Sequence, residues 1–201
     1  MYESVVEKFE RYVDKCEVEN AATFNVDLAT EARRRVQQLE FLYNKVQKQH
    51  DWYMELNWRE RRRVESMRKQ SGITSGSITL ERSDESVVME SLIFEIETLT
   101  EAFYYLASRF RTILRKGPFP GLHSFECEGA RNVRNHLLEH PEGGNSRIFA
   151  QSFGVGGEQG PTLKIERDAG QEHVFPDAGL WANAQEIKNN LEALLDRLLS
   201  S

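Results

Sequence analysis

Hydrophobic residues recur at alternating intervals of three and four along most of the chain, which is the period of an amphipathic α-helix. The first stripe begins at Val6 and ends at Cys16. A second begins after Asp27 and continues to Met67, because no proline or glycine interrupts it before Gly72. Its first members are Ala32, Val36, Leu39, Tyr43 and Val46. The first third of the chain is therefore predicted to form two helices.

The most regular stripe lies in the middle of the chain and predicts a third long helix. Ser83 or Asp84 is expected to cap its start. Its last turn is basic, which suits the negative end of a helix dipole, and Gly117 and Pro118 follow. The stripe keeps the 4-3-4-3-4-3 spacing over Leu92, Ile96, Leu99, Phe103, Leu106, Phe110 and Ile113. Three such helices favour a closed bundle over an isolated coiled coil.

The rest of the chain predicts a shorter helix, a β-hairpin and a final helix. The shorter helix covers roughly 125–139 and ends before Pro141, since a residue that precedes proline disfavours the α conformation. The segments 147–153 and 161–165 flank the glycine-rich GVGGEQG, which lacks the GK[ST] ending of a phosphate-binding loop. A final helix begins near Asn183 and is marked by Ile187, Leu191, Leu194 and Leu198.

These elements predict a mainly α fold, in which a helical bundle carries a long N-terminal helical arm and a small β-hairpin insertion. The arm comprises residues 1–70. Residues 71–82 are a flexible linker, because they include the small, nearly uncharged sequence SGITSGSIT. The helical domain then covers 83–201, with the hairpin at 147–165.

Composition narrows the class of protein. Hydrophobic residues make up 39% and charged residues 29% of the 201 residues, which is ordinary for a globular protein. No run approaches the roughly 18 apolar residues that cross a bilayer, so no membrane partner is expected. Cys16 and Cys127 are the only two cysteines and form no CxxC pair. A cytoplasmic protein without structural disulfides is the simplest interpretation.

The net charge of −6 is unevenly distributed. Residues 1–31 hold three basic and eight acidic side chains, whereas residues 32–70 hold eleven basic and five acidic ones. A basic block in an acidic protein can be a nucleic-acid surface. It can equally neutralise the acidic segment before it, or be a solvated helix face. The sequence leaves these three interpretations open.

The fourth helix holds the residues with the clearest chemical potential. At 100° per residue, Leu137 shares the predicted buried face with Ala130 and Val133. Arg134 and His140 lie about 60° to either side of Leu137, next to the packing face. Asn135 lies on the opposite, polar side. An arginine, a histidine and an amide on one helix are groups that can bind a phosphodiester or transfer its protons.

This pattern resembles the Arg-polar-x-His motif of the HEPN superfamily, the higher eukaryotes and prokaryotes nucleotide-binding domains. In that family, an arginine is followed on one helix of an α-bundle by a polar residue and, a few positions later, by a histidine. Arg134, Asn135 and His140 match it, with five residues between the arginine and the histidine. An alternative register uses Arg131, Asn132 and His136. The first is preferred because its arginine and histidine flank the packing face.

The resemblance covers roughly residues 83–200 and implies a function. HEPN proteins cleave RNA without a metal or other cofactor, often in toxin or defence systems, and act as homodimers in which two Arg–His pairs line one cleft. For this chain it implies RNA as substrate, a homodimer, and Arg134, Asn135 and His140 as catalytic residues. One caution is physical, because a histidine in a last helical turn favours its charged form, which suits an acid better than a base. The N-terminal arm is left as a candidate surface for a protein partner.

Two other interpretations compete. His136, Glu139 and His140 spell H-x-x-E-H, the zinc-binding pattern of inverted-zincin peptidases. That pattern needs a third ligand. Glu186 and Glu192 lie downstream, but nothing in the sequence around them marks either as a metal ligand, so no metal site is expected. The remaining interpretation is a non-catalytic helical dimerisation or scaffold module, in which Arg134 and His140 are structural.

Overall fold

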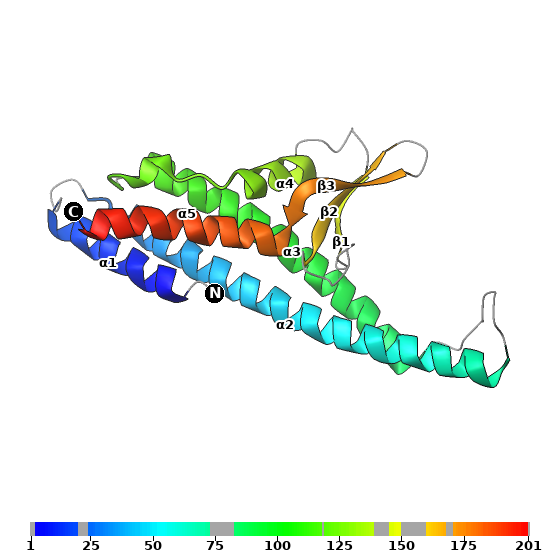
Figure 1. Ribbon diagram of the computed structural model, residues 1–201. Helices are drawn as coiled ribbons and strands as arrows, with labels where there is room; N and C mark the ends of the chain where they lie inside the picture. Colours follow the sequence, from blue (N-terminus) through cyan, green and yellow to red (C-terminus); the bar gives the residue numbers. More distant parts are fainter. Residues whose placement is uncertain are drawn as a thin grey trace.

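A computed structural model describes residues 3–19, 24–72, 83–117, 119–138, 145–149, 160–167 and 171–200 (Figure 1). The predicted linker lies outside these residues apart from its first two positions, and so does most of the segment between the first two predicted strands. The protein is mainly α, as the sequence predicts. Its α-helices are α1 (Glu3–Glu19), α2 (Val26–Gln70), α3 (Asp84–Lys116), α4 (Glu128–Leu138) and α5 (Leu180–Ser200).

The long helices α2 and α3 pack against each other as an antiparallel hairpin. At the far end of this hairpin, the C-terminal part of α2 and the N-terminal part of α3 extend beyond the other helices (Figure 1). Side-chain caps start both helices, since Asn25 accepts a hydrogen bond from the backbone of Leu28 and Ser83 accepts one from Ser86. Nothing interrupts α2 over its 45 residues. The absence of proline and glycine from this stretch explains its continuity.

The remaining helices cover the near half of this hairpin. α1 packs on α2 and α5, while α4 packs on α3 and α5. Phe9 of α1 meets Phe110 of α3 edge to face, with ring centroids 5.7 Å apart. One hydrophobic core thus includes residues from both sides of the boundary that the sequence places at 71–82. Within the described parts of the chain, no helix is long and apolar enough to span a bilayer.

A small antiparallel sheet precedes α5. It has the order β1-β2-β3, formed by Asn145–Phe149, Thr162–Arg167 and Gln171–Gly179. β1 and β2 overlap the two ends of the predicted hairpin at 147–165, each extending two residues beyond it, and Ile148 pairs with Leu163 in the register. β3 was not anticipated. Its last residue runs directly into α5, and the backbone of Leu180 donates a hydrogen bond to the carbonyl of Pro161.

The predicted stripes describe the buried faces closely. In α3, Leu99 and Leu106 lie at the edge of the core and the other five members of the stripe are buried. The boundaries of the shorter helices differ more. α4 begins at Glu128 rather than Phe125, because Phe125 ends a short 3-10 helix (η1, Leu122–Ser124) and packs in the core. α5 begins at Leu180, three residues before Asn183.

Candidate functional site

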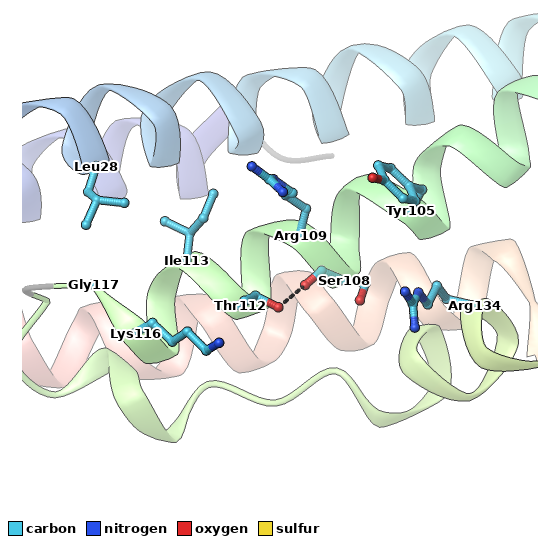
Figure 2. Close-up of a pocket in the computed structure, with 9 residues that line it drawn as sticks. All are labelled: Leu28, Tyr105, Ser108, Arg109, Thr112, Ile113, Lys116, Gly117 and Arg134. Atoms are coloured by element: carbon cyan, nitrogen blue, oxygen red, sulfur yellow. Dashed lines mark hydrogen bonds between the residues drawn. The ribbon is translucent and has the colours of Figure 1, made fainter. Parts of the chain in front are cut away.

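A groove of about 350 Å³ runs over the outer face of the last turns of α3. α2 borders it on one side and α4 on the other (Figure 2). Three cations, Arg109, Lys116 and Arg134, surround it, and none of the described residues that line it is acidic. The other lining residues are Leu28, Tyr105, Ser108, Thr112, Ile113 and Gly117. The groove therefore has the charge and the hydrogen-bond donors of an anion-binding site.

The groove is positively charged because the bases near the end of α3 fall into two groups, those that bind Glu126 and those that line the groove. Glu126 binds the two arginines that face away from the groove, with Arg111 donating at 2.6 and 2.9 Å and Arg115 at 2.8 Å. These hydrogen bonds hold the pKa of the Glu126 carboxyl below its usual range, chiefly through Arg111. Among the described residues, no carboxylate forms an ion pair with Arg109 or Lys116. Seven residues apart, these two share one face of α3.

The position of α4 is set by its first turn. The carboxylate of Glu186 on α5 accepts hydrogen bonds from the backbone N–H groups of Glu128 (2.9 Å) and Gly129 (3.2 Å). A negative charge at a helix N-terminus satisfies free donors and favours the helix dipole. Gly129 permits this close approach, because a Cβ there would lie 2.0 Å from Oδ1 of Asn183.

Two further hydrogen bonds fix α5 against the same region. The amide of Asn183 donates to the hydroxyl of Tyr104 at 3.0 Å, and both residues are buried. Asn190 donates to the carbonyl of Glu126, also at 3.0 Å. A buried polar pair is costly to leave unsatisfied, so these contacts specify one placement of α4 and α5 relative to α3.

The side chains of Arg134 and Asn135, two residues of the preferred motif, contact each other, although the sequence places them on different faces of the helix. Arg134 lines the groove, and its Nη1 donates a hydrogen bond to the side-chain oxygen of Asn135 at 3.2 Å. The sequence placed Asn135 on the polar face, and the structure finds it half-buried. His140 lies outside the described residues. The structure thus brings together two of the three residues of this register and describes no contact of the third.

The alternative register is arranged differently. Arg131 lies 3.6 Å from the carboxylate of Glu128, one turn before it on α4. Asn132 and His136 are half-buried. None of these three residues lines the groove. The preferred register is therefore the one with a residue in the groove.

The carboxylates considered as a third zinc ligand are engaged elsewhere. Glu186 caps α4, and Glu192 forms an ion pair of 2.8 Å with Lys8 of α1. Glu139 and His140 of the H-x-x-E-H sequence lie outside the described residues. Across the part of the chain that the structure describes, no group of three or more His, Cys, Asp or Glu side chains is placed to hold a metal.

Comparison of the chain with protein-family models, with curated proteins and with solved structures found no match. Arg109 and Lys116 were not among the residues that the sequence singled out for the site. Their seven-residue spacing on the outer face of α3 is the signal that could have identified them. Arg111 and Arg115 lie in the same part of α3, however, and residue type alone does not separate the four bases.

Proposed function

We propose that this protein is a HEPN-like RNA endonuclease whose groove between α3 and α4 binds the phosphodiester backbone. The observation that carries the proposal is the placement of Arg134, a residue of the HEPN-like motif, beside two other cations in a groove whose described lining residues include no acid. The proposal combines that placement with the resemblance in sequence, which supplies the catalytic histidine, His140.

The groove supports phosphate binding in two ways. A guanidinium can donate two parallel hydrogen bonds to one phosphate, and Arg109 can supply such a fork. Arg134 adds a second guanidinium, whose Nη1 already donates to Asn135. Tyr105, half-exposed at 53%, offers a ring beside them. An exposed aromatic ring next to phosphate-binding cations is the arrangement that stacks a single-stranded base.

The proposed reaction uses the RNA as its own nucleophile. The ribose 2′-hydroxyl loses its proton and attacks the adjacent phosphorus, and the bond from phosphorus to the 5′-oxygen breaks. The leaving oxygen takes up a proton, so the products are a 2′,3′-cyclic phosphate and a 5′-hydroxyl. Arg134 stabilises the charge that grows on the phosphate oxygens, and the resemblance assigns proton transfer to His140.

The test is cleavage of single-stranded RNA in the presence of a chelator, with product ends identified by mass spectrometry. We expect a 2′,3′-cyclic phosphate, and loss of cleavage in both Arg134→Ala and His140→Ala. The matched control is His136→Ala on the same helix, which should cleave normally. Thermal unfolding should show changes within about 1–2 kcal/mol for Arg134→Ala. Cleavage that survives His140→Ala but is lost with His136→Ala would identify the alternative register.

A second candidate function is a helical dimerisation or scaffold module. It is favoured by an apolar stripe on the outer face of α3, formed by Val87, Phe94 and Tyr105, of which Phe94 is 73% exposed. Large apolar side chains in one exposed row commonly mark a contact with another chain. Because Tyr105 also lines the groove, a homodimer formed through this stripe would bring two grooves together. Sedimentation of the wild type and of Phe94→Lys tests the dimer directly, and a monomeric wild type would contradict it.

A further inference from the structure

The far half of α2 presents a second basic surface, distant from the groove. Its exposed residues lie opposite Tyr53 and Leu56, which are buried against α3. We call this surface the distal face; it is formed by Met54, Trp58, Arg61, Arg62, Glu65 and Lys69. From Leu28, at the groove, to Trp58 is about 45 Å along the helix at its usual rise per residue.

Internal ion pairs account for only part of the basic block of α2. In the near half, Arg33 binds Asp14 of α1 and Lys45 binds Glu95 of α3 at 2.8 Å. Of these two pairs, only that of Arg33 agrees with the interpretation of the block as a partner for the acidic segment 1–31, because Glu95 lies outside that segment. Residues 59–70 differ, because they contain six basic and only two acidic side chains.

In this far segment, the ion pairs run along the flank that faces α3. Arg59 binds Glu55 and lies 3.9 Å from Glu85, and Arg63 binds Glu60 at 2.9 Å. Arg61 and Arg62 form no ion pair with any residue that the structure describes. Three bases, Arg61, Arg62 and Lys69, thus stand against one carboxylate, Glu65, on the distal face, which keeps a positive charge.

Tryptophan at the centre of this face separates it from an ordinary solvated helix surface. Trp58 is 53% exposed, although tryptophan is usually among the most buried residues on average. The guanidinium carbon of Arg62 stacks 3.9 Å from the centroid of its ring. This cation–π contact holds the ring and the charge together in one place. Trp52, 47% exposed, lies about a turn and a half before Trp58 on the same helix.

We propose that the distal face binds single-stranded RNA, with a base stacked on Trp58 and phosphates held by Arg61, Arg62 and Lys69. The combination of an exposed aromatic ring with unneutralised guanidinium groups is the one by which proteins bind single strands without sequence preference. An acidic protein partner would need the charges but not the ring. The inference rests on the proposed function for its substrate class. In that function, the distal face would hold the distant part of a long RNA while the bond to be cleaved lies in the groove.

The test compares the binding of two fluorescent RNAs to the full chain, one of about five nucleotides, near the lower limit of a single-strand binding site, and one of about 30, well beyond its upper limit. The variant Trp58→Leu, and the double variant Arg61→Gln with Arg62→Gln, should each weaken binding of the long RNA about tenfold. Binding of the short RNA, which the groove holds, should be unchanged. Trp58→Phe keeps a stacking ring and should restore most of the affinity.

A control variant and a salt titration make the experiment more specific. The double variant Arg59→Gln with Arg63→Gln removes an equal charge from the same segment but from the ion-paired flank that faces α3, and it should have little effect. The double variant of Arg61 and Arg62 should also reduce the slope of log affinity against log salt by about 1.4, as expected when two phosphate contacts to a single strand are lost.

Each other outcome has a definite meaning. Unchanged binding of the long RNA in Trp58→Leu and in the double variant of Arg61 and Arg62 would overturn the distal face as an RNA site. Binding of polyglutamate that depends on the arginines, together with RNA binding indifferent to Trp58, would identify an acidic protein partner instead. If the short RNA fails to bind while the long RNA binds through Trp58, the groove proposal fails and the distal face stands.

Discussion

The guanidinium of Arg134 donates a hydrogen bond of 3.2 Å to the side-chain oxygen of Asn135, its neighbour in the chain. Successive residues on a helix point about 100° apart, so this contact requires both side chains to bend towards one another. It gives the second residue of the HEPN-like motif a physical role. Asn135 orients the arginine at the groove and need not touch the substrate itself.

We therefore predict that Asn135→Ala weakens binding of a short RNA about fivefold without removing it, which is the scale of one hydrogen bond to a charged group that is partly exposed. Asn135→Asp should weaken binding further, because its carboxylate competes with phosphate for Arg134. Fluorescence anisotropy with the short RNA measures both. Equal affinities for the wild type and both variants would leave Asn135 without a positioning role.

Gly129→Ala should destabilise the protein, although alanine is the better helix former by about 1 kcal/mol. The added Cβ would lie 2.0 Å from Asn183, which is held in a buried hydrogen bond with Tyr104. Overpacking of this kind costs about 1–3 kcal/mol, so after the gain in helix propensity we expect a net loss of up to about 2 kcal/mol in urea denaturation.

Ser91→Ala provides the control for this substitution, since Ser91 is exposed on α3 and its replacement changes little but helix propensity. It should be neutral or slightly stabilising. A stable Gly129→Ala variant would mean that α4 and α5 do not approach as closely as the structure places them.

His50 makes stability depend on pH. It is 4% exposed, and its ring meets Trp181 edge to face at 5.7 Å. Burial lowers its pKa from the ordinary 6.5, an effect that Asp51 partly opposes. The unfolded chain therefore takes up a proton before the folded one does, and stability falls as the pH drops below about 6.5.

The expected loss from His50 is about 1.4 kcal/mol per pH unit between its unfolded and folded pKa values. Urea denaturation at a series of pH values from neutral to mildly acidic measures it. His50→Phe should remove this contribution, so that its stability falls less over the same range. A variant that follows the wild type in parallel would show that His50 does not titrate with a lowered pKa.

The segment 71–82 should be the first internal site of cleavage in limited proteolysis. Its sequence has small residues and no apolar stripe to hold it to the core, whereas α2 and α3 on either side each have one. Mass spectrometry of the early fragments locates the cut. First cleavage within 92–113 would be incompatible with α3 as a continuous buried helix.

The sequence was sufficient for the helices because their causes are local. The spacing of Ile96, Phe103 and Phe110 determines the buried face of α3, and Ser83 determines its start. Comparable local signals were missing for β3, which the sequence did not predict. The predicted start of α4 near Phe125 was also wrong, because Phe125 packs in the core before the helix begins at Glu128.

For the candidate site, the sequence predicted Arg134, Asn135 and His140 as site residues, and it placed four bases, Arg109, Arg111, Arg115 and Lys116, near the end of the third predicted helix. Which of those charges remain available was decided only by tertiary structure. Glu126 neutralises Arg111 and Arg115 but neither Arg109 nor Lys116. Composition cannot distinguish these four bases, since the ion pairs depend on where the loop before α4 crosses α3. The groove likewise exists because Glu186, 58 residues away from Glu128, holds the start of α4 in place.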